Sequence, residues 1–190
     1  METGSMKLVL GLTGPMGSGK GTVADYLKNK GFFYTSTSDR IREEIRARGE
    51  EITRESLCRV SDELRAEFGP EVLASRTWDI VMKQENDFAI IDSIRNELEV
   101  DFLKKQKGFY LLGIDAPMEI RFERVKDRNR EGDALTWEEF VKQAAIDFDS
   151  GLGKMGRNVS ACLAKADFLI ENTGTLEELK EKIDDVITKI

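Results

Sequence analysis

A glycine-rich run near the start of the chain ends in a lysine and has the spacing of a phosphate-binding loop. Residues 14–20 read Gly-Pro-Met-Gly-Ser-Gly-Lys, which fits the pattern G-x-x-x-x-G-K. Glycines let successive backbone N–H groups turn toward a polyphosphate, and we expect Lys20 to be exposed, with its charge near the outer phosphates. The alternative is a glycine turn with a surface lysine. Phosphate binding is expected of Gly14, Gly17, Ser18, Gly19, Lys20, Gly21 and Thr22.

A hydroxyl and a carboxylate follow at positions suited to holding a magnesium ion. Gly21 comes directly after Lys20, so the first hydroxyl lies one position later, at Thr22. Asp92 ends the apolar run at 87–92, and in P-loop proteins an acid at such a strand end helps to organise Mg²⁺. The sequence therefore predicts that Thr22 and Asp92 hold the metal. The alternative for Asp92 is a loop cap.

Arginines are concentrated in one stretch of a chain whose formal net charge is −7. Arg121, Arg124 and Arg128 have the i, i+3, i+7 spacing of one helix face, and Arg130 follows them. Such a face is suited to binding phosphates. The alternative is a solvated face whose charges are neutralised by neighbouring acids.

The composition narrows the class of protein. The 190 residues are 40% hydrophobic and 34% charged, as in a globular domain, and the acidic balance argues against a generic cationic grip on nucleic acid. The chain has no histidine, which excludes histidine dyads, histidine triads and histidine-ligated zinc. Two isolated cysteines favour a reducing compartment, and no apolar run has the roughly 20 residues of a membrane span. We therefore expect a cytoplasmic protein.

Apolar and amphipathic segments alternate along the chain. Strands are predicted at 7–13, 32–34, 87–92, 109–114 and 167–170. Helices are predicted at 22–30, 39–48, 54–68, 71–84, 97–106 and 118–127, and after the capping boxes that begin at Thr136 and Thr175. This alternation predicts an α/β fold with a parallel sheet covered on both faces. Residues 1–6 are expected to be an expression tail, and residues 7–190 a single domain.

Several motifs resemble those of P-loop nucleoside monophosphate kinases. GPMGSGKGT at 14–22 resembles the phosphate loop of adenylate kinases, and GLTG at 11–14 is similar to that of dephospho-CoA kinases. TSTSDRIR at 35–42 resembles the I-S-T-G-D-x-L-R segment of adenylate kinases, and RVKDR at 124–128 resembles the R-I-x-x-R that opens their lid. The ending at 166–179 resembles A-D-x-x-I-x-N-x-G-(S/T)-L-E-E-L, which both kinase families share.

The resemblance assigns residues to the acceptor. It implies that Thr37 touches the acceptor base and that Arg42 grips the acceptor phosphate. DSIR at 92–95 resembles a shortened D-G-F-P-R, which makes Arg95 the second arginine on that phosphate. The alternative for Thr37 and Arg42 is an ordinary helix cap followed by a solvated arginine.

The resemblance also assigns residues to the donor. It implies that Arg124 covers the nucleotide base and that Arg128 contacts the transferring phosphates. Asn172 and Gly174 lie in the loop that packs on the donor adenine, and the alternative is a turn with its cap. The residues expected to act in catalysis are Lys20, Asp92 and Arg128.

The match spans residues 7–190 and is strongest to a mainly archaeal family of adenylate-kinase-related P-loop proteins. It rests on I-D-x-I-R at 91–95, F-G-P at 68–70 and W-E-E-F at 137–140. The resemblance implies a three-layer α/β/α P-loop kinase fold with a five-stranded parallel sheet in the order 2-3-1-4-5. It also implies a helical acceptor-side insertion at 39–84 and a small lid at 124–157, for which the glycine-rich run at 151–156 supplies a hinge.

The expected activity is transfer of the γ-phosphoryl group of ATP, with Mg²⁺, to a small phosphorylated acceptor such as a nucleoside monophosphate. Such transfer needs positioning and charge neutralisation, so a chain without histidine can catalyse it. The alternatives are a dephospho-CoA kinase-like enzyme, or an ATPase or nucleotide-dependent switch that binds a partner. The expected ligands are ATP and the acceptor, without nucleic acid or membrane. The acceptor, the donor base and the oligomeric state are left open.

Overall fold

The computed structural model describes residues 7–128, 136–148 and 156–190. The expected expression tail, part of the predicted lid and most of its predicted glycine hinge lie outside these residues. Arg130 lies outside them as well. In the part of the chain that is described, no helix is both long and apolar enough to cross a membrane.

A five-stranded parallel sheet forms the centre of the molecule. Its strands are β1 (Leu8–Thr13), β2 (Phe33–Ser36), β3 (Phe88–Asp92), β4 (Phe109–Asp115) and β5 (Phe168–Glu171). Their order is β2-β3-β1-β4-β5, which confirms the predicted topology. β1 is central because it pairs on both sides, with Leu10 opposite Ile90 of β3 and Tyr110 of β4. The ends of β1 and β3 therefore lie beside each other, which brings the glycine loop close to Asp92.

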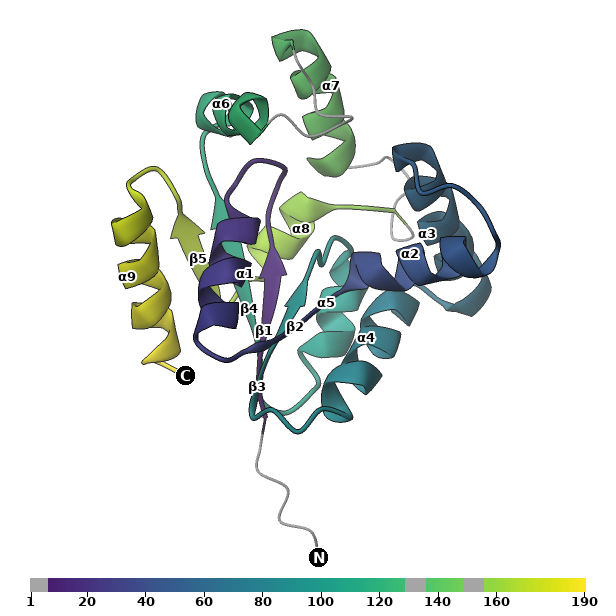
Figure 1. Ribbon diagram of the computed structural model, residues 1–190, viewed down its shortest axis with the longest axis horizontal. Coiled ribbons are helices and arrows are strands. Elements are labelled where there is room, and N and C mark those ends of the chain that lie inside the picture. The colour runs from purple at the N-terminus through teal and green to yellow at the C-terminus, as the bar shows by residue number, and fades with distance from the viewer. Residues whose placement is uncertain (1–6, 129–135, 149–155) are drawn as a thin grey trace, which may run out of the picture.

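Helices cover both faces of the sheet (Figure 1). They are α1 (Lys20–Asn29), α2 (Thr37–Ala47), α3 (Arg54–Phe68), α4 (Val72–Met82), α5 (Glu97–Leu103), α6 (Met118–Arg128), α7 (Trp137–Phe148), α8 (Val159–Ala164) and α9 (Leu176–Ile187). Leu10 and Leu12 point to a core shared with α1 and α9. Val9 points to a second core, shared with α4, α5 and α8. This period of two along β1 produces the three layers.

The helices that follow β2 carry a small core of their own. Ile41 and Ile45 of α2 pack with Val60 and Leu64 of α3 and with Leu73 of α4. α4 also covers the sheet, since Ala74 and Val81 belong to the core beneath β1 and β3. The predicted insertion at 39–84 thus consists of α2 and α3 as a projecting pair and of α4 as a bridge to the sheet. In Figure 1, α6 and α7 lie beyond the ends toward which the strand arrows point.

Local signals explain where several helices begin. Thr53, predicted to cap a helix, accepts the N–H of Ser56 at 3.1 Å, and Thr175 caps α9 in a capping box with Glu178. The polar connection predicted at 35–38 is wrong, because these residues complete β2 and begin α2. Ser36 ends the strand and caps the helix by accepting the N–H of Asp39 at 3.1 Å. The short helix α8 was not predicted, although Asn158 caps it by accepting the N–H of Ala161 at 2.8 Å.

Candidate active site

A large cavity opens at the carboxyl ends of the strands, where parallel α/β sheets bind ligands. Its volume is about 1070 Å³, which exceeds the roughly 300–1,000 Å³ of a pocket for one small ligand. Among the described residues, eight lysines and arginines line it, against four aspartates and glutamates. The cations are Lys20, Arg42, Arg54, Arg65, Arg95, Arg124, Arg128 and Arg157. An acidic chain therefore gathers positive charge in one cavity large enough for two ligands.

Two glycines of the phosphate loop are required by close contacts. Gly17 has φ +80°, and a Cβ there would lie 2.5 Å from the carbonyl oxygen of Arg121. Gly19 has φ +104°, and its Cβ would lie 2.3 Å from Nδ2 of Asn172. A side chain at either position would be strained and would clash. The loop is thus fitted between α6 on one side and the segment after β5 on the other.

We predict that Gly19→Ala lowers the melting temperature, whereas Gly21→Ala does not. Alanine at position 19 combines an unfavourable φ with a clash against Asn172, so it should lower the free energy of unfolding by about 1–3 kcal/mol. Gly21 is the matched control, since a Cβ there meets no protein atom within 4 Å. Thermal unfolding of both variants without ligand measures the difference. Equal melting temperatures would contradict this account of the loop.

Lys20 is folded back onto the phosphate loop. Its ammonium donates to the carbonyl oxygens of Gly14 at 2.6 Å and Pro15 at 2.9 Å, and the side chain is half-buried. The expectation of an exposed lysine is therefore wrong, because the loop carbonyls hold the ammonium against the protein. Burial, and then the charge of Arg95, lower the pKa of Lys20 to about 8. The negative charge of an incoming phosphate would raise this pKa again, so the site favours an anion beside this amine.

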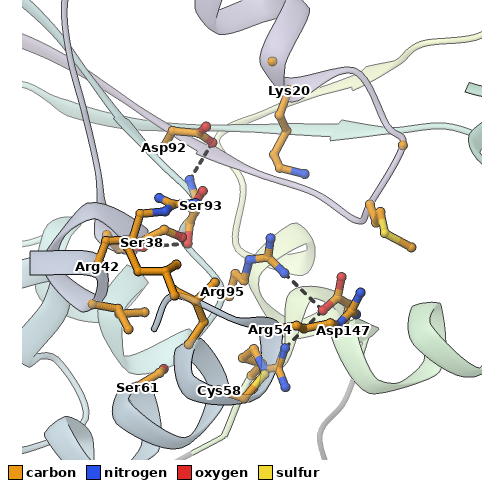
Figure 2. Close-up of a pocket in the computed structure, with 18 of the residues that line it drawn as sticks. Lys20, Ser38, Arg42, Arg54, Cys58, Ser61, Asp92, Ser93, Arg95 and Asp147 are labelled. Carbon is orange, nitrogen blue, oxygen red and sulfur yellow. Dashed lines mark hydrogen bonds and ion pairs between the residues drawn. The ribbon is translucent and has the colours of Figure 1, made fainter. Parts of the chain in front are cut away.

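Asp92 ends β3 with its carboxylate held from two sides. Tyr34 O–H donates to Oδ2 at 3.1 Å. The backbone N–H of Ser93 donates to Oδ1 at 2.5 Å, as Figure 2 shows. Burial and the nearby Asp92 charge raise the pKa of Tyr34, so its phenol stays protonated. Thr22 lines the same cavity. One hydroxyl and one oriented carboxylate fit a Mg²⁺ that takes its other ligands from water and phosphates.

The two arginines predicted for the acceptor both line the cavity, each with an acidic partner. Arg42 donates to Oδ1 of Asp39 at 3.1 Å, one helical turn away. Arg95 donates to Oδ1 of Asp147 at 3.1 Å, and Arg157 donates to the same oxygen at 3.2 Å. Sequence reasoning missed Asp147 and Arg157, because both come from segments distant in the chain with no motif to mark them.

Thr37 is held by an internal hydrogen bond at the start of α2. Its side chain is buried, and its hydroxyl donates to the carbonyl oxygen of Ser93 at 2.7 Å. The residue lines the cavity, so its remaining lone pairs can still accept from a ligand. The bond also ties the start of α2 to the segment after β3.

The arginines of α6 separate into two groups. Arg124 and Arg128 line the cavity, and burial lowers the pKa of Arg124. Arg121 does not share that face. It is buried beneath the phosphate loop, where Nε donates to the Ala116 carbonyl at 3.0 Å and the guanidinium lies over the ring of Phe140 at 5.7 Å. Its spacing was compatible with phosphate binding, but its contacts support the loop from below.

A smaller cavity of about 170 Å³ adjoins the loop on the side of β5. Arg124, Asn172 and Gly174 line it together with Gly19 and Thr22, so the residues predicted for the donor base meet there. Asn172 donates from Nδ2 to the Ser18 carbonyl at 2.9 Å, and its backbone N–H donates to the Asp115 carbonyl at 2.7 Å. These bonds fix the wall of the smaller cavity to the phosphate loop.

A buried ion pair supports the segment that carries Arg95. Arg65 of α3 donates to Oε1 of Glu99 of α5 at 2.9 Å, and both residues are almost fully buried. The other oxygen, Oε2, accepts the backbone N–H groups of Arg95 at 3.2 Å and Asn96 at 3.3 Å. α3 is thereby linked through α5 to the backbone of Arg95. Sequence reasoning missed this pair.

The chain matches known proteins over most of its length. Residues 10–144 match the AAA domain family. A UPF0200 protein of Methanocaldococcus jannaschii is 30% identical over 96% of this chain and 90% of its own length. Another, from Pyrococcus horikoshii, is 33% identical over 96% of this chain and 97% of its own.

Solved structures share the fold at low sequence identity. TT1252 from Thermus thermophilus matches with a TM-score of 0.66 and 22% identity, over 97% of this chain and 98% of that one. Shikimate kinase from Acinetobacter baumannii, in complex with shikimate, matches with a TM-score of 0.58 and 19% identity, over 97% of this chain and 95% of that one. The P-loop kinase fold expected from the resemblance is confirmed. The chain belongs to the UPF0200 family of P-loop proteins with an AAA domain.

Proposed function

We propose that the protein transfers the γ-phosphoryl group of ATP to a small phosphorylated acceptor, with a nucleoside monophosphate as the leading candidate. The observation that carries this proposal is a shared cavity. Lys20 and Asp92 line it from two neighbouring strand ends, and Arg42 and Arg95 line it from the segments that follow two strands. A donor site and a second anion site in one cavity are what phosphoryl transfer between two bound substrates requires.

The donor phosphates lie in the glycine loop in this proposal, next to the ammonium of Lys20. Thr22 and Asp92 would hold a magnesium ion, which would supply charge neutralisation at the transferring group. Tyr34 and the Ser93 amide donate to the Asp92 carboxylate and so fix its orientation. Arg128 adds charge at the transferring phosphate. The donor base lies in the smaller cavity beside Arg124, Asn172 and Gly174.

The acceptor phosphate binds between Arg42 and Arg95. Arginine suits this task because its planar fork can donate two hydrogen bonds to one phosphate. In the free protein, Asp39 and Asp147 occupy these guanidinium groups, so an acceptor dianion must compete with two carboxylates. The cavity extends past Arg42 along α3, which leaves room for the rest of the acceptor.

An acceptor screen tests the activity. ADP release from ATP with Mg²⁺ is measured with each nucleoside monophosphate, with dephospho-CoA and without acceptor. Shikimate, the ligand in the Acinetobacter structure, serves as an acceptor without phosphate. Stimulation by a monophosphate supports the proposal, and stimulation by dephospho-CoA supports the alternative kinase. Slow turnover that no acceptor stimulates contradicts both and favours an ATPase or switch.

We predict that Arg42→Ala and Arg95→Ala each raise the KM of the acceptor at least tenfold and leave the KM of ATP nearly unchanged. A charge-assisted hydrogen bond is worth about 1.5–3 kcal/mol, which corresponds to this loss. Arg128→Ala should instead lower kcat. Steady-state kinetics with each substrate varied in turn separate the effects.

Arg46→Ala is the matched control, because Arg46 lies in α2 like Arg42, is exposed, and is not among the residues that line the cavity. If Arg42→Ala weakened ATP binding and spared the acceptor, the assignment of the two sides would be wrong.

A further inference from the structure

Ser93 adopts a backbone conformation that side chains disfavour. Its φ is +65°, and no other residue of the described chain except glycine has a positive φ. For a residue with a Cβ this region costs of order 1 kcal/mol, and glycine would avoid the cost. Strain of this kind concentrates at functional sites.

Hydrogen bonds on both sides lock this conformation. The Ser93 N–H donates to Oδ1 of Asp92 at 2.5 Å, and the Ser93 carbonyl accepts the hydroxyl of Thr37 at 2.7 Å. Neither bond involves the Ser93 side chain. The conformation of the Ser93 backbone and its two hydrogen bonds therefore do not depend on the hydroxyl. A glycine at this position could form the same two bonds.

Ser93 lies in the cavity at a position where its hydroxyl can donate to a bound ligand. Ser93 lies between Asp92, on the donor side, and Arg95, on the acceptor side, and it lines the cavity. Figure 2 shows it beside Asp92, close to Ser38 and Arg42 at the start of α2. No hydrogen bond from the Ser93 hydroxyl is found among the described residues, so this donor is available to a ligand.

From this geometry we infer that the Ser93 hydroxyl donates a hydrogen bond to the acceptor's phosphate, next to Arg42 and Arg95, and helps to select acceptors that carry a phosphate there. The inference rests on the proposed function and adds a specificity-determining residue to it. The backbone strain is compatible with this role, because replacing serine with glycine would relieve the strain and lose the contact.

The test measures binding of inorganic phosphate, so it does not depend on finding the acceptor. The phosphate loop is first saturated with ADP and Mg²⁺, and thermal unfolding is then followed as phosphate is added. The phosphate concentration that gives half of the maximal rise in melting temperature is the measured quantity. Ser93→Ala and Ser93→Gly should both raise this concentration about tenfold, as expected for loss of a hydrogen bond to a charged group. The control Ser160→Ala changes an exposed serine of α8, which does not line the cavity, and should leave this concentration unchanged.

The two variants at position 93 also separate strain from binding. Without phosphate, the melting temperature of Ser93→Gly should equal or exceed that of Ser93→Ala, since only alanine keeps a Cβ at positive φ. Unchanged phosphate protection in both variants, or no protection of the wild type, would overturn the inference. If the wild type bound phosphate and transferred no phosphoryl group to any acceptor, the proposed function would be wrong and the Ser93 contact would stand.

Discussion

Replacing Lys20 with methionine should lower kcat for phosphoryl transfer about a thousandfold while the protein stays folded. A hydrogen-bond donor held in place where charge develops in the transition state raises the rate about 10²–10³-fold. The ammonium of Lys20 is held at the phosphate loop by the carbonyls of Gly14 and Pro15, so we expect it to be such a donor. Methionine keeps the length and apolar stem of the side chain and removes the charge. Turnover with ATP and Mg²⁺ at saturating acceptor measures the loss.

The lowered pKa of Lys20 gives this prediction a second readout. With a pKa of about 8 in the free protein, the amine loses its charge as the pH rises above 8, so nucleotide affinity should fall in that range. Lys20→Met should lack this fall, because it has no proton to lose. Titration calorimetry with ADP between pH 7 and about 9.5 compares the two proteins.

Lys126→Met is the control for both measurements, since Lys126 is exposed on α6 and, among the described residues, pairs only with Glu123 and the ring of Phe122. Unchanged turnover by Lys20→Met would contradict the phosphate-loop interpretation. The same pH dependence in both proteins would assign the titrating group elsewhere.

Removing the buried carboxylate of Glu99 should destabilise the protein by about 3–5 kcal/mol. Glu99→Ala leaves the guanidinium of Arg65 almost fully buried without its main partner, and it strips two backbone N–H groups of their acceptor. Chemical denaturation of the wild type and the variant measures the difference in unfolding free energy.

Two further variants test the cause of that loss. Arg65→Met combined with Glu99→Leu removes both charges and keeps the volume, so it should recover the part of the stability that is lost to the unpaired charge, while the two N–H groups still lack their acceptor. Lys104→Ala breaks the surface pair with Asp167, whose side chains are about one-third exposed, and should cost less than about 1 kcal/mol. If Glu99→Ala were no worse than Lys104→Ala, the ion pair would not be what stabilises this region.

The double variant should also fold with a weakened acceptor site. Glu99 holds the backbone of Arg95, and neither leucine nor methionine can accept its N–H. The expected KM of the acceptor is therefore higher than in the wild type even where stability is restored. Acceptor binding and stability separate in this variant because Glu99 holds the backbone of Arg95, and because Arg65 is itself one of the cations that line the cavity.

The order of the elements was readable from the sequence because its signals are local. The apolar runs of the strands, the glycines of the phosphate loop and the caps at Thr53 and Thr175 each depend on neighbours within a few positions. Boundaries were less accurate where two signals compete. Residues 35–38 carry hydroxyls that indicate a turn, yet pairing with β3 extends the strand to Ser36.

Within the site, the segments that meet at the strand ends could be predicted from the sequence, since parallel strands end at one edge of the sheet. The arrangement of their charges depends on tertiary packing. Arg95 and Asp147 are 52 positions apart, and Arg65 and Glu99 are 34 apart. Spacing cannot reveal such pairs, because it describes one element at a time. For the same reason helical spacing grouped Arg121 with the arginines of the cavity, although packing beneath the phosphate loop gives it a different role.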